Sequence, residues 1–256
     1  MLRSRIIPCL LIHNGGLVKT KNFTDPKYVG DPINAVKIFN EKEVDEIIVA
    51  DIDATRFNRE PDYVLIEQIA KECRMPFCYA GGITKPEQID KIVSLGVEKV
   101  AIGASVIHNP DLIKNAATRV GNQSIVVVMD VKKTGLFQKY EVVTHNATKT
   151  TGVNPIDLAK KSEQLGAGEI LINSVNRDGC LNGYDLDLIN AIRSAVQLPI
   201  TVLGGASSVN DFKQLINKFG IIGAAAGSIF VFKGKYRAVL IQYPSQEEKN
   251  KIFEGL

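Results

Sequence analysis

The chain repeats one short stretch of sequence, first as PFCYAGGIT (76–84) and again as PITVLGGASS (199–208). In each copy an apolar run ends in a Gly-Gly pair, which is typical of a buried strand followed by a tight turn. Matching positions, such as Gly82 and Gly205, are separated by 123 residues. The other repeats are EIIVADIDATR (46–56) with EILINSVNRDG (169–179) and, more loosely, KVAIGASVI (99–107) with GAAAGSIFV (223–231). Internal repetition at a fixed spacing predicts two copies of one half in a single chain.

Short β-branched apolar runs alternate with longer amphipathic stretches, which is the pattern of parallel strands connected by helices. The strands are predicted near 5–12, 47–52, 76–80, 99–103, 124–130, 169–174, 199–203 and 222–226. Eight strands in 256 residues predict an α/β fold, a single (β/α)₈ TIM barrel over 1–256 built from two duplicated half-barrels, about 1–120 and about 121–256. No Pro/Gly/Ser-rich linker divides the halves, which favours one closed sheet over two domains.

Composition and charge exclude several classes of protein. The chain is 45% hydrophobic and 23% charged, and its net charge of +3 is scattered, so neither a nucleic-acid stripe nor a membrane-binding face is indicated. Four cysteines without ligand spacing favour reduced thiols, and no metal or cofactor is expected. The short apolar run in MLRSRIIPCLLIHNGG (1–16) lacks a small-residue cleavage site and predicts a first strand. The expected location is the cytoplasm.

Small residues follow four of the predicted strands. Two strands end in the Gly-Gly pairs, and the strand after each pair ends in 103–105 or 227–228. Small residues at these positions let backbone N–H groups approach a phosphate, although each turn alone is equally typical of a tight connection. The repetition favours two phosphate sites for a ligand with a phosphate at each end. The candidate contacts in these turns are Gly82, Gly103, Ala104, Gly205, Gly227 and Ser228.

Several motifs occur in the order seen in the cyclase family of imidazole glycerol phosphate synthase, which the sequence resembles from Arg5 to about Ser228. They are RIIPCLL, Lys19, the strand with Asp51, AGGI, VVVMDVK around Asp130, NRDG followed by GYD (176–185), and LGGA. The resemblance implies a barrel that receives ammonia from a class I glutaminase and adds it to a bis-phosphorylated ribotide. Elimination and ring closure then give imidazole glycerol phosphate and an aminoimidazole carboxamide ribotide.

The resemblance implies two aspartates as general acid and base, one at the end of the first strand and one at the end of the fifth. Carboxylates suit both roles because burial and neighbours tune their pKa toward neutral pH. Asp130 is the fifth-strand residue, but the first-strand position is Leu11, which cannot transfer a proton. The internal repeat, RIIPCLLIH beside SIVVVMDVK, also sets Leu11 opposite Asp130.

Other mouth positions partly match the resembled family. Lys19, predicted in a long first loop, matches a substrate contact, and Asp178 with Gly179 matches the second phosphate site. His13 follows the first strand, where it is either a replacement proton shuttle or a loop histidine. Three departures are His13-Asn14 for a basic and an acidic residue, Gly103-Ala104 for an Asn-Thr clamp, and Asn176 for an aspartate. His108 and His145 have no ligand spacing and are predicted in surface or loop roles.

Four charged residues at the N-terminal ends of strands match the family fully: Arg5, Glu46, Lys99 and Glu169. The resemblance implies that they form a salt-bridge ring that gates ammonia entry, whereas a stabilising ion-pair belt is the alternative. Mutual neutralisation gives such a ring a well-defined closed state. No cysteine lies on a recognisable nucleophile elbow, so a partner class I glutaminase subunit, forming a heterodimer, is implied.

The C-terminal segment FVFKGKYRAVLIQYPS (230–245) departs from the family's last helix, and residues 233–256 are compatible with a short helix or an extended piece. With IPCLL near the start, it resembles a divergent branch that works with a glutaminase and a third, sugar-amidating subunit in surface-polysaccharide pathways. We therefore expect ammonia delivery to a nucleotide-activated N-acetyl sugar. The alternative is a working histidine-pathway cyclase that uses Asp130 alone or with His13. The sister ribotide isomerase also needs the carboxylate that Leu11 replaces.

Overall fold

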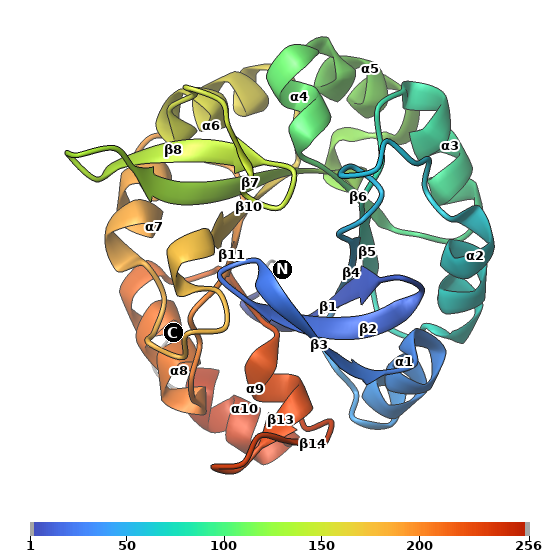
Figure 1. The fold of residues 1–256 in the computed structure, drawn as a ribbon, viewed down its shortest axis with the longest axis vertical. Coiled ribbons are helices and arrows are strands. Elements are labelled where there is room, and N and C mark those ends of the chain that lie inside the picture. Colours follow the sequence, from blue (N-terminus) through green and yellow to red (C-terminus); the bar gives the residue numbers. More distant parts are fainter. Residues whose placement is uncertain (1–2, 254–256) are drawn as a thin grey trace.

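The chain forms a closed parallel barrel in a computed structural model that describes residues 3–253. Within these residues eight strands pair side by side, and the circle closes where β12 joins β1 and β7 joins β10 (Figure 1). The barrel strands are β1 (Arg5–His13), β4 (Ile47–Asp51), β5 (Phe77–Ala80), β6 (Lys99–Ile102), β7 (Ile125–Thr134), β10 (Glu169–Ser174), β11 (Ile200–Leu203) and β12 (Gly223–Ala226). The predicted α/β barrel and its eight strands are confirmed, whereas the division into halves stays a prediction.

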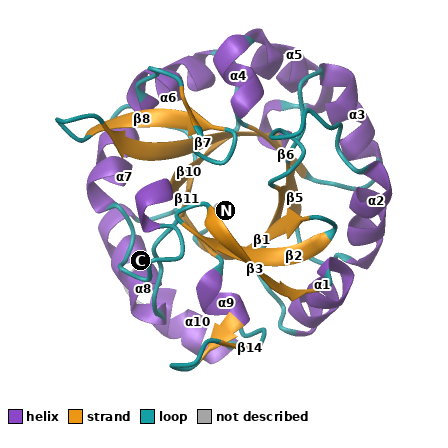
Figure 2. Cartoon of the chain, in the orientation of Figure 1, coloured by secondary structure: helices purple, strands orange, loops and turns teal. Residues whose placement is uncertain are grey.

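Helices surround the barrel and bury one apolar face against it (Figure 2). They are α1 (Pro32–Glu41), α2 (Tyr63–Glu72), α3 (Pro86–Ser94), α4 (Ala104–His108), α5 (Asp111–Val120), α6 (Pro155–Gln164), α7 (Leu186–Arg193), α8 (Val209–Phe219), α9 (Ser228–Val231) and α10 (Gln246–Phe253). Local sequence determines where they begin. In α8, Ser208 and Asp211 form a reciprocal capping box, and proline opens α1, α3 and α6. No helix within 3–253 is long and apolar enough to cross a membrane.

Alternation along the strands sorts the inward side chains into layers, because successive residues of a strand point to opposite faces. The floor layer carries the charged residues Arg5, Glu46, Lys99 and Glu169. Above it lies an apolar layer of buried side chains: Ile7, Cys9, Ile48, Cys78, Ala101, Val126, Leu171 and Ala225. Leu11, Ala80, Val128 and Leu203 pack on that layer from the mouth side. A fully buried isoleucine or leucine in such a layer contributes about 1.5–3 kcal/mol.

Two hairpins rise from the barrel strands, and neither was predicted. The first contains β2 (Gly16–Lys21) and β3 (Thr24–Gly30), which continue antiparallel from β1. The second pairs the extended end of β7 with β8 (Lys139–Thr144) and β9 (Lys149–Thr150). The prediction of a long first loop around Lys19 is therefore wrong, because this residue lies on β2 and is buried.

The C-terminal segment is extended before its last helix. A hairpin of β13 (Phe232–Lys233) and β14 (Ala238–Val239) follows α9, and residues 240–245 lead to α10. Tyr243 anchors this path, since its hydroxyl donates to the Ile6 carbonyl at 2.8 Å and accepts from the Asp45 N–H at 3.2 Å. Of the two conformations left open for 233–256, the extended one holds up to 245 and a helix follows; residues 254–256 lie outside the described range.

Candidate active site at the barrel mouth

The carboxyl ends of the strands surround a cavity of about 620 Å³, which we call the mouth cavity. Leu11, Lys19 and Asp130 line it. All predicted phosphate contacts line it as well: Gly82, Gly103, Ala104, Asp178, Gly179, Gly205, Gly227 and Ser228. The fold therefore brings residues from distant parts of the chain into one site, as in other barrels of this type.

Close backbone approaches explain the glycines of the two Gly-Gly turns. Gly82 has φ +69°, and a Cβ there would lie 2.6 Å from the Arg59 carbonyl oxygen. Gly205 has φ +108°, and its Cβ would lie 2.0 Å from the Gly183 carbonyl oxygen. Side chains are excluded at both positions, so backbone rather than side chains forms these walls of the mouth cavity.

Asp130 presents the carboxylate of the site. Burial raises its pKa to about 7, against the hydrogen bond that Asn173 Nδ2 donates to Asp130 Oδ1 at 3.0 Å. A carboxyl group with this pKa can exchange protons near neutral pH. Asn173 Oδ1 is buried without a hydrogen-bond partner among the residues described, so one acceptor of the site is unused. Leu11 offers no second proton-transfer group.

Lys19 and Thr20 lie on β2 of the first hairpin, beside the predicted second phosphate site around Asp178 and Gly227. Lys19 Nζ donates to the Cys9 carbonyl, and a Cβ on Gly227 would lie 2.4 Å from the same nitrogen. Burial lowers the pKa of Lys19, because the charged amine is desolvated. Thr20 Oγ1 donates to Asp178 Oδ2 at 2.7 Å, although burial still raises the pKa of that carboxyl. Lys19 thus stands inside the mouth cavity rather than in solvent.

His13 lies outside the mouth cavity. Its Nδ1 is 2.8 Å from Asp53 Oδ1, and the Asn14 N–H donates to Asp53 Oδ2 at 2.8 Å. Burial raises the pKa of Asp53, but these two contacts outweigh it and the pKa is lowered. The geometry therefore assigns His13 to bracing the β1–β2 turn and gives no support to a proton shuttle opposite Asp130.

The charged residues of the barrel floor form one closed ring, the floor ring (Arg5, Glu46, Lys99 and Glu169). Lys99 Nζ lies 2.9 Å from Glu46 Oε1 and 2.8 Å from Glu169 Oε2. Arg5 contacts the same two carboxylates: it pairs with Glu46, and its Nη2 lies 2.8 Å from Glu169 Oε1. Burial raises the pKa of Glu169, but Arg5 and Lys99 outweigh burial and lower it. Each cation therefore contacts two carboxylates.

Three residues around these sites were not singled out as functional from the sequence. Thr201 Oγ1 donates to Glu169 Oε1 below the apolar layer, and Asn173 positions Asp130 above it. Asp53 holds the first turn through its contacts to His13 and Asn14. The alternation of side chains along the strands could have predicted that Asn173 and Thr201 point into the barrel. Asn173 is the β10 residue paired with Asp130, and Thr201 lies on the inward face of β11.

Fold and site together define a class: single (β/α)₈ barrels with a mouth cavity between two glycine-rich turns and a charged floor. The family model described as "Histidine biosynthesis protein" matches residues 5–237. The chain belongs to this family, as a divergent HisF-like subunit of the cyclase type.

Relatives of this family cover nearly the whole chain. A provisionally named imidazole glycerol phosphate synthase subunit hisF3 of Vibrio vulnificus is 55% identical over 99% of this chain and 98% of its own length. A provisionally named subunit hisF2 of Pseudomonas aeruginosa is 49% identical over 100% of both chains. The imidazole glycerol phosphate synthase subunit HisF of Streptococcus mutans is 38% identical over 90% of this chain and 91% of its own length.

Proposed function

We propose that this barrel takes up ammonia at its floor from a partner class I glutaminase and delivers it to a phosphorylated acceptor in the mouth cavity. The observation that carries the proposal is a floor ring with every charge paired, placed below a dry layer of apolar side chains. Ammonia stays unprotonated in such an interior, because water and proton donors are excluded. The Gly-Gly turn after β5 and the residues after β6 would hold a phosphate group of the acceptor.

The acceptor we propose is a nucleotide-activated N-acetyl sugar, whose acetamido group becomes acetamidino during surface-polysaccharide synthesis. Ammonia would add to the amide carbon and the carbonyl oxygen would leave, overall as water, so that C=O becomes C=NH; a third subunit would activate that oxygen as a leaving group. Leu11 supports this proposal, because a ring-closing cyclase needs a second proton-transfer group where the leucine stands.

The alternative is a working cyclase of histidine biosynthesis. Its support is the single cavity between two glycine-rich turns, together with the pKa of Asp130 near 7. In that case Lys19 is the better second proton-transfer group, since it lines the cavity whereas His13 does not. Loss of one of two such groups costs roughly 10²–10⁴-fold in rate.

A cyclase assay separates the two functions. Purified protein, ammonium salt and the bis-phosphorylated ribotide are mixed, and imidazole glycerol phosphate is followed for the wild type, Leu11→Asp and, as a matched uncharged control, Leu11→Asn. We expect little turnover by the wild type and by Leu11→Asn, and a gain of roughly 10²-fold in Leu11→Asp. Wild-type turnover at ordinary cyclase rates would overturn the sugar-amidation proposal.

A further inference from the structure

The two ends of the mouth cavity differ in charge. At the end formed by the first half of the chain and the β8–β9 turn, the lining holds five basic side chains: Arg59, Lys85, His108, His145 and Lys149. At the other end Asp130 and Asp178 face a single cation, Lys19. We call the set of five basic side chains the basic wall. Its charges gather from four separate segments of the chain, so they are not the by-product of one charged helix face.

Most of the basic wall has no acidic partner. Lys85, His108, His145 and Lys149 form no ion pair with any residue in the described part of the chain, whereas Arg59 lies 3.4 Å from Asp53. Burial lowers the pKa of His145, and the nearby charges of Lys149 and His108 lower it further. Positive charge nearby thus disfavours protonation of His145, and an anion bound between these groups would favour its protonated form.

The turn that carries His145 is held over the mouth cavity by its own contacts. Asn146 Nδ2 donates to the Ile52 carbonyl at 3.0 Å, which ties the turn to the end of β4 across the barrel. His145, Asn146 and Ala147 have φ of +54°, +56° and +60°, a run of left-handed residues without glycine. Figure 1 shows this loop, after β8, reaching over the barrel. The backbone thus fixes His145 on the cavity side instead of leaving it free in solvent.

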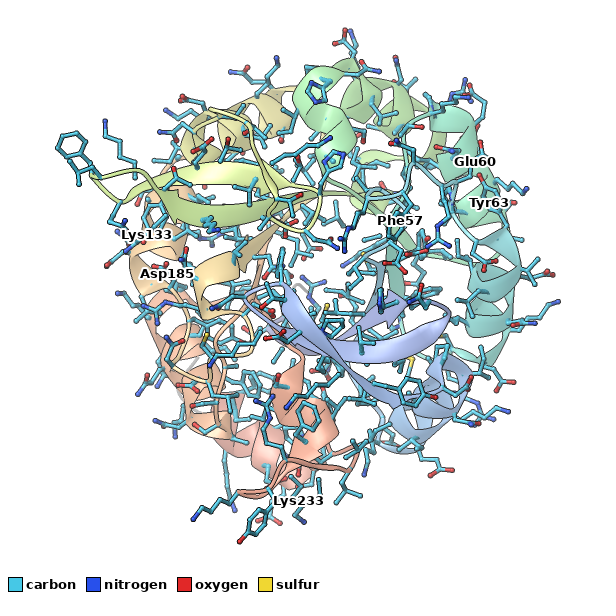
Figure 3. The ribbon with its side chains drawn as sticks, in the orientation of Figure 1. Phe57, Glu60, Tyr63, Lys133, Asp185 and Lys233 are labelled. Carbon is cyan, nitrogen blue, oxygen red and sulfur yellow. The ribbon has the colours of Figure 1, made fainter. Side chains whose placement is uncertain are left out.

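Two further side chains define the space beside the basic wall. Ser105 Oγ, in the cavity lining, is buried without a hydrogen-bond partner among the described residues and can donate to a bound anion. Asp51 and Glu60 are the acidic residues of this end of the lining, and the Glu60 carboxylate accepts from Gln88 Nε2 at 3.5 Å. Figure 3 shows Glu60 on the segment between β4 and α2, beside Tyr63. Arg59, Lys85 and Lys149 outnumber these two carboxylates, so the net charge of this end of the lining is positive.

We propose that the basic wall binds a second phosphoryl group next to the one at the first Gly-Gly turn, so that the ligand carries a diphosphate at this end. Backbone N–H groups near Gly82 and Gly103 are the predicted contacts of the first phosphate, and four basic side chains in the same lining, Lys85, His108, His145 and Lys149, have no ion pair among the described residues and are available to a second phosphate. In naming a biological ligand the inference rests on the proposed function, since a nucleotide-activated sugar is joined to its nucleoside through a diphosphate.

Titration calorimetry with inorganic pyrophosphate and inorganic phosphate, at fixed ionic strength, tests the inference without the amidation reaction. We expect the wild type to bind pyrophosphate at least about tenfold more tightly than phosphate, and the His145→Gln/Lys149→Gln double variant to reduce this ratio to less than about threefold. The matched control is Lys160→Gln/Lys161→Gln, on the exposed outer face of α6, which should keep the wild-type ratio.

Two results would overturn the proposal: equal affinities for the two anions in the wild type, or an unchanged ratio in the cavity variant. A thermal melt of each variant identifies a folding defect. If the cavity variant melts early, single His108→Gln and Lys149→Gln variants replace it, and each should lower the ratio. Because only inorganic anions are used, failure here is distinct from failure of sugar amidation, which the cyclase assay addresses.

Discussion

The floor and the mouth of this barrel carry polar groups in opposite states. On the floor, Lys99 contacts both carboxylates of the floor ring, and Arg5 does the same. At the mouth, Asp130 is opposite a leucine and Lys19 is bonded to a backbone carbonyl. The charged groups of the floor are thus paired with one another, whereas polar atoms of the mouth cavity, such as Asn173 Oδ1, have no partner among the described residues. A ring that is complete without ligand suits a gate, and unsatisfied donors and acceptors suit a binding site.

The largest effect that we expect from a single change of charge is on the floor. Glu169→Gln removes one carboxylate from the floor ring and leaves an uncompensated cation, which costs roughly 3–5 kcal/mol in the free energy of unfolding. Denaturant unfolding measures this loss. Adding Lys99→Met to Glu169→Gln should recover much of it, because the remaining Arg5 and Glu46 neutralise each other.

An exposed ion pair provides the control for that loss. Lys251 and Glu247 lie 2.7 Å apart on the surface of α10, four residues apart in sequence. Glu247→Gln should therefore cost only about 0.3–0.5 kcal/mol. A loss in Glu169→Gln as small as this would contradict the expectation and show that the floor ring contributes no more to stability than an exposed ion pair.

The mouth should show its unsatisfied state as a pH dependence. In the unfolded chain Asp130 loses its proton near pH 4, but in the folded protein its pKa is about 7. As the pH rises from about 4 to about 7, the folded state retains a proton that the unfolded state has lost, so this group makes stability fall. Asp130→Asn removes this pH dependence. The free energy of unfolding of the variant, measured against that of the wild type, should therefore be higher at pH 8 than at pH 4 by roughly 2–4 kcal/mol.

Urea unfolding at several pH values between 4 and 8 measures the Asp130 effect. The control is Asp25→Asn, which changes an exposed carboxylate on β3 and should leave the pH dependence of the wild type unchanged. A parallel pH dependence in Asp130→Asn and in the wild type would show that Asp130 ionises normally and is not desolvated by the cavity.

The barrel strands were predictable because their pattern is local. Parallel strands buried on both faces are continuous apolar runs, so β10 was predicted at 169–174, and β11 was predicted one residue longer at its start. The repeat also indicated the two Gly-Gly turns, whose backbone clashes require glycine. The resemblance implied the four residues of the floor ring; they form ion pairs with one another, and their role as a gate stays a prediction.

The position of Lys19 could not be predicted, because it depends on a hairpin with little sequence signal. β3 reads TDPKYVG, is largely exposed and contains a proline, so it has neither alternation nor an apolar run. The pairing of His13 with Asp53 is also a tertiary contact between residues 40 positions apart. The local sequence pattern does not show where either side chain points. For this reason Lys19 was predicted in a loop and His13 was predicted as a candidate residue of the site.

Entry of ammonia through the floor ring is tested by Lys99→Ala in the complex with the partner glutaminase. Product formation is measured with glutamine and, separately, with ammonium salt supplied to the mouth side. We expect Lys99→Ala to change glutamine-dependent formation by about tenfold or more while ammonium-dependent formation stays near the wild-type value. Equal effects on both would contradict it and leave the floor ring with a purely structural role.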